Sequence, residues 1–307
     1  MNFLWIEKYR PSTLEDIVLP QKEKEIFSKY VNEKKIPNLL LTSIDPGLGK
    51  TSLAKILVKE TDSDCLFLNG NLDTSIDIMR SRVLDFCSSV SIDGNPKVVF
   101  LDECENLSIN SLESLKSTIE TFSHISFILT ANQETKIPEP IKNRLIHFDF
   151  DEMFFNNKKE IMSLIAKRLQ FILKQENISF NKEDLVKVIK TFYPSSRAMI
   201  KILQQYSINQ ELKLPEKLEQ QGDIFNLIID NIKNKDFTEM RQNITKVLDP
   251  GSFYIYCFKN LDLFKDESKP EVILELAKYQ DLDSRARDKI ITLGALCVEL
   301  MLKAKFN

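Results

Sequence analysis

The sequence predicts an α/β protein in which a parallel β-sheet is followed by an entirely helical part. In the first half of the chain, short apolar runs alternate with amphipathic segments of helical periodicity. The apolar runs are continuous rather than alternating, which is typical of parallel strands covered on both faces. From Lys158 onward, only helical periodicity is found.

Five apolar runs are predicted to be buried strands. They are residues 38–42, 65–68, 98–101, 127–130 and 146–148. Amphipathic segments such as 53–58 and 112–122 lie between them and are expected to form the covering helices. The alternation stops near residue 150, so the sheet domain is assigned to residues 1–152.

The helical part is expected to form two domains separated by a linker. The first, residues 153–208, contains three helices, of which Asn181 is placed to cap the second and Pro194-Ser195-Ser196 begins the third. The polar stretch 209–222 is interpreted as the linker. In the last domain, 223–307, the final helix is apolar nearly all round from 290 to 302, so it must be buried within the domain or against partners.

Composition narrows the class of protein. The chain has 307 residues, 43% of them hydrophobic and 28% charged, as in ordinary soluble proteins, and we expect no membrane association. Five dispersed cysteines without a CxxC pair, together with two histidines, exclude a zinc-ligand pattern and predict reduced thiols in the cytoplasm. A net charge of −3 means that DNA binding would need a local basic face.

Residues 44–51, with the sequence IDPGLGKT, follow the first predicted strand and open a helix. This is the context of a Walker A phosphate loop, which predicts binding of ATP with Mg²⁺. The backbone amides of this loop would cradle phosphate at a helix N-terminus. Lys50 would reach the β- and γ-phosphates, and the Thr51 hydroxyl would hold Mg²⁺. One position departs from the pattern, because Ile44 replaces its usual first glycine.

Two further motifs follow the next predicted strands. Asp102 and Glu103 come directly after the run 98–101, which is typical of a Walker B motif in which Asp102 orients Mg²⁺ and Glu103 polarises the attacking water. Asn132 follows the run 127–130 and could hold the lytic water or sense the γ-phosphate. A strand-terminal asparagine is also an ordinary turn residue.

Together with the opening sequence WIEKYRPSTLEDIV at 5–18, these motifs resemble the AAA+ ATPases, and among them the sliding-clamp loaders. The opening is similar to the signature of replication factor C small subunits. The spacing from it through Walker A, Asp102-Glu103-Cys104-Glu105 and Asn132 is also similar to that family. The resemblance extends to the large subunit of T-even-like phage clamp loaders and covers essentially the whole chain, more weakly after residue 205.

The resemblance implies an AAA+ module, a helical lid and a helical collar for the three domains, and it implies roles for individual residues. Arg197 matches sensor 2, which touches the γ-phosphate in cis. Arg144 matches the arginine finger that completes a neighbour's site, although Asn143 and Leu145 flank it where the family has serine and cysteine. On sequence grounds alone, both arginines could equally form surface salt bridges. The parts implied to hold nucleotide are the backbone of Ile6, Glu7, Lys8 and Tyr9, with Val18, around adenine, and Gly47, Leu48, Gly49, Lys50, Thr51 and Ser52 around the phosphates.

DNA contacts are also implied by the resemblance. Arg80 and Arg82 are the candidates for tracking phosphates, and a solvated basic face is the alternative. Lys116 stands where the family tends to have a basic residue that couples DNA to the Walker B acid.

The implied function is that of an ATPase subunit of a clamp loader. Several copies, together with a different loader subunit, would bind ATP at their interfaces, open a sliding clamp and load it onto primer–template DNA. The alternatives are another AAA+ motor, such as a branch-migration helicase or remodeller, and a structural loader subunit that binds nucleotide without hydrolysing it.

Overall fold

The computed structural model describes residues 3–71, 76–91, 93–215, 221–247 and 250–306. The chain divides into two compact units, Met1–Lys213 and Leu214–Asn307. Unit 1 contains the predicted AAA+ module and lid, and unit 2 contains the predicted collar.

A five-stranded parallel sheet in the order β2-β3-β4-β1-β5 forms the centre of the first unit. The strands are β1 (Leu39–Thr42), β2 (Asp64–Asn69), β3 (Lys97–Asp102), β4 (Ser126–Ala131) and β5 (Ile146–Asp149). All five predicted strands are therefore confirmed. The prediction that every strand is buried is wrong for the edges, because Phe67 on β2 is 42% exposed and Ile146 on β5 is 46% exposed.

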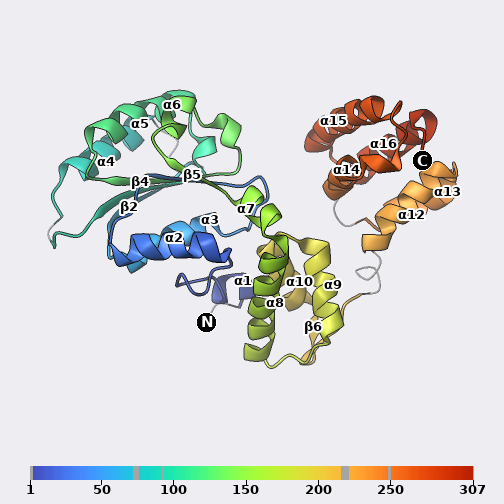
Figure 1. Ribbon diagram of the computed structural model, residues 1–307, viewed down its shortest axis with the longest axis horizontal. Helices are drawn as coiled ribbons and strands as arrows, with labels where there is room; N and C mark the ends of the chain where they lie inside the picture. The colour runs from blue at the N-terminus through green and yellow to red at the C-terminus, as the bar shows by residue number, and fades with distance from the viewer. Residues whose placement is uncertain (1–2, 72–75, 92, 216–220, 248–249, 307) are drawn as a thin grey trace. The chain divides into compact units, whose positions relative to one another are not determined.

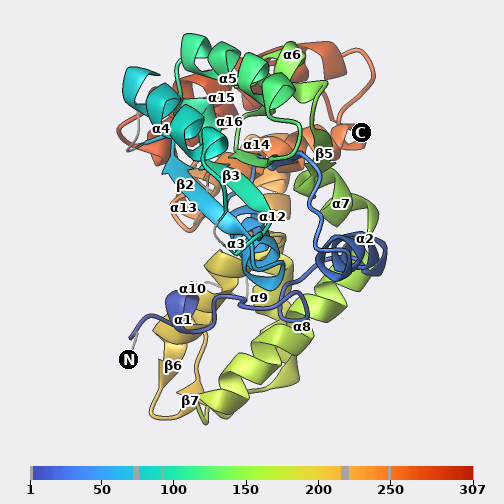
Figure 2. The same ribbon diagram turned by 90° about the vertical axis from the view of Figure 1, so that its left-hand side faces the viewer.

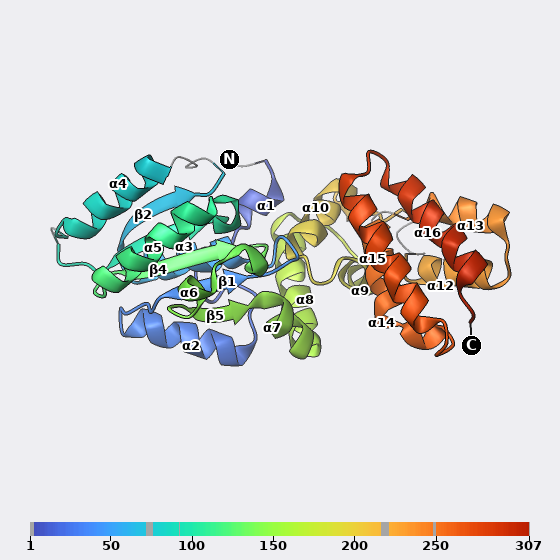
Figure 3. The same cartoon turned by 90° about the horizontal axis from the view of Figure 1, so that it is seen from above.

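Helices cover both faces of the sheet (Figures 1 and 3). One face carries α2 (Gln21–Asn32) and α3 (Lys50–Glu60), and the other carries α4 (Ile76–Ser88), α5 (Ile109–Thr121) and α6 (Glu139–Lys142). The short 3₁₀ helices η1 (Cys104–Asn106) and η2 (Glu134–Lys136) follow β3 and β4. Buried side chains such as Val99, Phe127, Leu112 and Leu115 form the core between the sheet and α5.

The remainder of this unit is helical, corresponds to the predicted lid and is called the lid; its long helix α8 is seen in Figure 2. It consists of α7 (Phe150–Asn156), α8 (Lys158–Gln175), α9 (Lys182–Phe192) and α10 (Ser196–Tyr206). The predicted cap forms, because the Asn181 side chain accepts a hydrogen bond from the Glu183 amide. The third helix begins at Ser196, as predicted, and the Ser195 side chain caps it by accepting a hydrogen bond from the Ala198 amide.

The lid ends in a small hairpin that the sequence analysis did not predict. Strands β6 (Ser207–Ile208) and β7 (Glu211–Leu212) pair antiparallel, so ordered structure continues into the predicted linker. The turn residues Asn209 and Gln210 both have positive φ, as a type I′ hairpin turn requires. Gln210 stands where a glycine usually announces such a turn, which is why the hairpin was missed. Residues 216–220 of the predicted linker lie outside the described residues.

The second unit is helical. Its elements are α12 (Gln221–Lys233), α13 (Phe237–Ile244), α14 (Pro250–Lys259), η3 (Leu261–Leu263), α15 (Lys269–Arg285) and α16 (Lys289–Lys303). Helix α16 places Leu293, Leu296 and Leu300 in the core, whereas Ile291 and Leu302 are 70% and 75% exposed. Within the described chain, no helix combines the length and the apolar character needed to span a membrane.

Candidate nucleotide-binding site

The phosphate loop connects β1 to α3, as predicted. Gly47 and Gly49 have φ of +88° and +110°, a region that side chains with a Cβ rarely adopt. A Cβ on Gly47 would also lie 2.7 Å from the Cβ of Arg197, so this glycine allows the lid to approach the loop. Helix α3 starts at Lys50, and its first amides have no partner within the helix. The loop is therefore built to bind an anion.

Ile44 is accommodated because its position does not require glycine. Its side chain is 82% exposed, and its backbone N–H donates to Asp151 Oδ2 at 2.5 Å. Asp151 lies in the first turn of α7, where the sheet module joins the lid. Burial raises the pKa of Asp151, against the effect of hydrogen bonds from the Ile44 and Asp45 amides. The loop is thus anchored to the start of the lid.

The ends of α3, β3 and β4 bring together oxygen atoms suited to Mg²⁺. The Thr51 hydroxyl donates to Asp102 Oδ1 at 2.8 Å, and the Thr130 hydroxyl donates to the same oxygen at 2.6 Å. A hydroxyl and a carboxylate at the edge of the phosphate loop are hard oxygen ligands, the type that Mg²⁺ prefers beside phosphates. Thr51 and Asp102 therefore fit the ion.

Glu103 follows β3 directly and adopts a left-handed conformation with φ of 55°. Its amide donates to the Thr130 hydroxyl at 3.0 Å, and its carboxylate accepts a hydrogen bond from Asn71 Nδ2. Gly70, after β2, packs against it so closely that a Cβ would lie 2.3 Å from the Glu103 carbonyl oxygen. The position of this carboxylate is therefore fixed by the neighbouring strand ends.

A series of hydrogen bonds between side chains holds Lys50 in place. Its Nζ donates to Ser43 Oγ at 2.6 Å and to Asn132 Oδ1 at 2.9 Å, and Asn132 Nδ2 donates to Glu105 Oε1 at 2.8 Å. Burial lowers the pKa of Lys50, against the raising effects of Asp151, Glu105 and Asp102. The arrangement directs Lys50 and Asn132 toward one small hollow of about 90 Å³, which both residues line.

A larger cavity of about 340 Å³ adjoins this hollow, within the size range of ligand pockets. The predicted residues that line it are Ile6, Glu7, Tyr9, Val18, Gly47, Leu48, Gly49, Thr51, Ser52, Asp102, Glu103 and Arg197. The N-terminal segment and α8 contribute apolar side chains such as Ile6, Ile165 and Leu169, and the phosphate loop contributes polar groups. The cavity thus has the two kinds of surface that a nucleotide presents.

Among the residues predicted for nucleotide sites, Lys50 and Asn132 line only the smaller hollow, and Lys8 and Arg144 line neither. The Lys8 side chain forms an ion pair with Glu176 at 2.6 Å instead of lining it. Arg144 lies after α6 and forms an ion pair with Glu120, so it does not line either hollow of its own chain.

Sequence reasoning missed lining residues contributed by α8, among them Ile165, Arg168 and Leu169. The sequence does contain one indication for Arg168. It follows Leu164 and Ile165 by four and three residues, so it places a charge on an otherwise apolar helix face.

The predicted DNA-contacting residues lie on α4 and α5. Arg80 and Arg82 are exposed on α4, but residues two apart on a helix do not share a face, so one surface cannot present both equally. Lys116 is half-buried on α5. The hydrogen bond found for the Glu103 carboxylate comes from Asn71 rather than Lys116.

Comparison with known proteins places these features in a family. Residues 40–152 match the family described as "ATPase family associated with various cellular activities (AAA)". The chain is 32% identical over 255 residues to the sliding-clamp-loader large subunit of Enterobacteria phage T4, covering 81% of this chain and 79% of that protein. It is 34% identical over 214 residues to the replication factor C small subunit of Sulfurisphaera tokodaii, covering 67% and 63% respectively.

A solved structure supports the fold. The RuvB Holliday junction branch migration motor of Thermotoga maritima aligns with a TM-score of 0.51 at 18% identity, covering 73% of this chain and 79% of that one. At that identity the likeness concerns the fold alone. The sequence relatives, the strand order of the sheet and the phosphate loop all indicate the same family. The chain belongs to the sliding-clamp-loader and replication factor C family of AAA ATPases.

Proposed function

We propose that this chain is the ATP-hydrolysing subunit of a sliding-clamp loader. It binds ATP with Mg²⁺ at interfaces between subunits, opens a ring-shaped clamp and loads it onto primer–template DNA during replication. The observation that carries the proposal is the joint placement of Lys50, Thr51, Asp102, Glu103 and Asn132 around one phosphate loop, in a chain of this family.

Within the site, each side chain has a distinct task. Bound Mg²⁺ supplies positive charge that offsets the charge of the phosphates, and Thr51 and Asp102 would hold it. Glu103 polarises the attacking water, while Asn132 holds that water or senses the γ-phosphate. Lys50 pairs with the β- and γ-phosphates, and Arg197 touches the γ-phosphate from the lid.

Arg144 acts on the site of a neighbouring subunit. Its present partners are Glu120, whose side chain is half-exposed, and the Pro140 carbonyl oxygen, and an ion pair at such a surface contributes only about 0–1 kcal/mol. Exchanging Glu120 for a neighbour's phosphate group therefore costs little. Phosphoryl transfer depends on positive charge near the phosphates, here supplied by Arg144 of a neighbouring copy. Hydrolysis is therefore fast only when the subunits are correctly assembled.

The assembly contains further copies of this chain and a different loader subunit, and it acts in the cytoplasm on a sliding clamp and primed DNA. Exposed apolar side chains on the second unit, such as Ile291 and Leu302 on α16, support assembly through this collar.

The two alternative functions are less well supported. A branch-migration motor is favoured only by the fold likeness to RuvB at 18% identity, against 32% identity to a clamp-loader subunit. A subunit that binds nucleotide without hydrolysing it would not need Glu103 placed beside Thr51 and Asp102.

The ATPase rate of the purified protein tests the proposal. We expect hydrolysis to rise when primed DNA and the sliding clamp encoded by the same genome are both present. Glu103→Gln should bind ATP normally and not hydrolyse it, whereas Lys50→Ala should lose binding itself. If the protein binds ATP but its hydrolysis rate does not change when DNA and clamp are added, the loader function is overturned.

A further inference from the structure

The wall of the nucleotide cavity opposite the phosphate loop is an irregular segment. Between Lys8 and Gln21 the described chain contains neither helix nor strand, yet Tyr9, Ile17 and Val18 from this segment line the cavity. A second hollow of about 290 Å³ lies against the same segment and is also lined by Ile17 and Val18. With open space on both sides and no regular secondary structure, the wall depends on side-chain contacts for its position.

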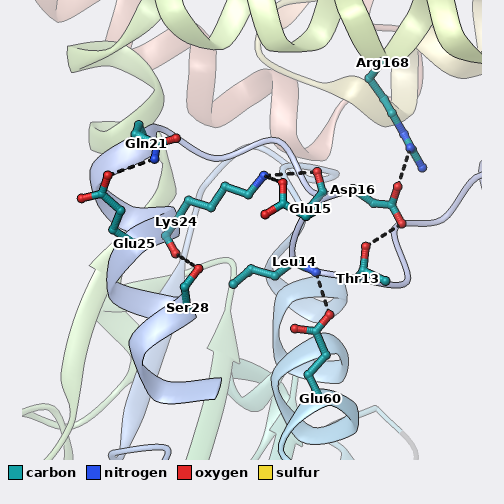
Figure 4. Close-up of polar contacts among 10 residues, drawn as sticks. All are labelled: Thr13, Leu14, Glu15, Asp16, Gln21, Lys24, Glu25, Ser28, Glu60 and Arg168. Atoms are coloured by element: carbon teal, nitrogen blue, oxygen red, sulfur yellow. Dashed lines mark hydrogen bonds and ion pairs between the residues drawn. The ribbon is translucent and has the colours of Figure 1, made fainter. Parts of the chain in front are cut away.

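Arg168 on the lid helix α8 holds this segment at two points. Its Nη1 donates to Asp16 Oδ1 at 3.0 Å, and its Nη2 donates to the Tyr9 carbonyl oxygen at 3.1 Å. Figure 4 shows the side chain reaching Asp16, whose other carboxylate oxygen accepts a hydrogen bond from Thr13 at 2.9 Å. The planar guanidinium suits this double contact, because its donors are arranged as a rigid fork.

The environment strengthens the contact with Asp16. The Arg168 side chain is only 18% exposed, and that of Asp16 is 35% exposed. Burial alone would raise the pKa of Asp16, but the Thr13 hydrogen bond and the charge of Arg168 outweigh it and lower that pKa. Asp16 is therefore ionised at neutral pH and pairs with Arg168 as a charge.

Other anchors tie the same segment to both sides of the site. The Leu14 amide donates at 3.0 Å to Glu60, in the last turn of α3, the helix that begins at the phosphate loop (Figure 4). The Tyr9 hydroxyl donates at 2.5 Å to Glu176, at the end of α8. The wall thus bridges the phosphate-binding helix and the lid, and Arg168 is the anchor that also lines the nucleotide cavity.

We propose that Arg168 is a positioning residue that fixes the base-side wall of the nucleotide cavity and ties base binding to the lid. This rests on the proposed ATP site. The hydrogen bonds of Arg168 go to residues 9 and 16, whereas the phosphate loop is approached by α10 through Ser195, whose hydroxyl donates to the Pro46 carbonyl oxygen at 3.1 Å. Arg168 therefore acts on the base and not on the phosphates.

The test compares a ligand that has a base with one that lacks it. Dissociation constants for Mg-ATP and for Mg-tripolyphosphate are measured by displacement of a fluorescent ATP analogue from the full-length chain. The variants are Arg168→Ala, Arg168→Lys and Asp16→Asn. Lys167→Ala is the matched control, because this neighbour on α8 is exposed and lines the second hollow but not the nucleotide cavity.

We expect Arg168→Ala to weaken ATP binding about tenfold, the effect of removing hydrogen bonds to a charged group, and to change tripolyphosphate binding less than about twofold. Arg168→Lys should recover part of the affinity, because one ammonium cannot make both contacts in the same geometry. Asp16→Asn should weaken ATP binding relative to tripolyphosphate binding in the same direction, and Lys167→Ala should match the wild type. Unchanged ATP affinity in Arg168→Ala, or equal weakening of both ligands, would overturn the proposal.

Hydrogen exchange of the ligand-free protein provides an independent readout. Amides of residues 10–18 should exchange faster in Arg168→Ala and Arg168→Lys, while those of 50–60 should not. Equal exchange of residues 10–18 in wild type and variants would contradict the positioning role. If wild-type protein binds neither ligand, the proposed ATP site fails, and the exchange comparison still decides whether Arg168 holds the wall.

Discussion

The side chains of the nucleotide site hold one another in place. Lys50 is fixed between Ser43 and Asn132, and Thr51 is fixed on Asp102. Groups that are already oriented need little reorganisation when charge develops on a phosphate, which is the main source of catalysis in such sites. The same principle applies to Glu103, whose backbone is held both by the hydrogen bond of its amide to the Thr130 hydroxyl and by close packing against Gly70.

Gly70 gives this packing a direct test. In Gly70→Ala, the new Cβ would lie 2.3 Å from the Glu103 carbonyl oxygen, so the backbone at Glu103 must shift. Because misplacement of a catalytic group by about 1 Å can cost on the order of 10²-fold in rate, we expect a decrease of that order in ATP hydrolysis. ATP binding, measured by calorimetry, should change little, since the phosphate loop is not displaced.

Gly294→Ala is the matched control for Gly70→Ala. Gly294 lies in α16 with open space around its Cβ position, and alanine favours a helix. Because α16 carries the proposed assembly surface, light scattering first checks that this variant assembles like the wild type, and it should then keep the wild-type hydrolysis rate. Full activity in Gly70→Ala would show that the packing against Glu103 does not position the carboxylate.

Among the elements, the lid helices carry contacts to both halves of the nucleotide cavity. Helix α10 begins beside the phosphate loop, where Ser195 and Arg197 approach Gly47. Helix α8 holds the opposite wall through Arg168, and Glu176 just after the helix adds a second anchor. Ligand bound between them would therefore favour one position of the lid relative to the sheet, which is how a binding event can drive a conformational change.

The sequence was sufficient to predict the strands and the motifs at their ends, because continuous apolar runs and a phosphate loop are local patterns. It could not reveal the partners of Glu103 and Asn132, since Asn71 and Glu105 meet them only through the strand order of the sheet. The role of Arg168 likewise depends on a partner 152 residues away in the chain, which no local pattern encodes.

Helix α4 carries the predicted DNA contacts. Changing Arg80 and Arg82 to alanine should lower DNA stimulation of the ATPase and leave the rate without DNA unchanged. The decrease should be alike for different DNA sequences, because phosphate contacts position without reading bases.

The salt dependence of DNA binding, followed by fluorescence anisotropy, should become shallower by about one unit of slope for each phosphate that an arginine no longer neutralises. Because the two arginines do not share a helix face, the single variants should differ in effect. If DNA affinity and its salt dependence are unchanged in both single variants, DNA binding would be assigned to other elements, with Lys116 on α5 the next candidate.

At the scale of the whole molecule, we expect the division into two units to separate catalysis from assembly. The first unit contains every residue that lines the nucleotide cavity. The second has its own core, formed by residues such as Ile228, Phe253, Leu276 and Leu296. A unit with its own core can fold alone, so each part is expected to keep its role when separated.

Truncation after Lys213 tests this separation. The shortened chain should remain folded and bind ATP, because the cavity and its anchors are complete within it. It should be monomeric by light scattering, whereas the full chain should form larger assemblies. A truncated chain that still assembles would place the main contacts between subunits in the first unit.

The central claim is that the chain hydrolyses ATP as an assembly in which a neighbour's Arg144 completes each site. Arg144→Ala alone should bind ATP normally and hydrolyse it on the order of 10³-fold more slowly. Mixed with Lys50→Ala, which lacks a working phosphate loop, it should regain activity wherever an intact Lys50 site meets an intact Arg144. The mixed ATPase rate is the most direct measurement. Rescue above the sum of the separate variants supports the claim, and no rescue between subunits shown to exchange would contradict it.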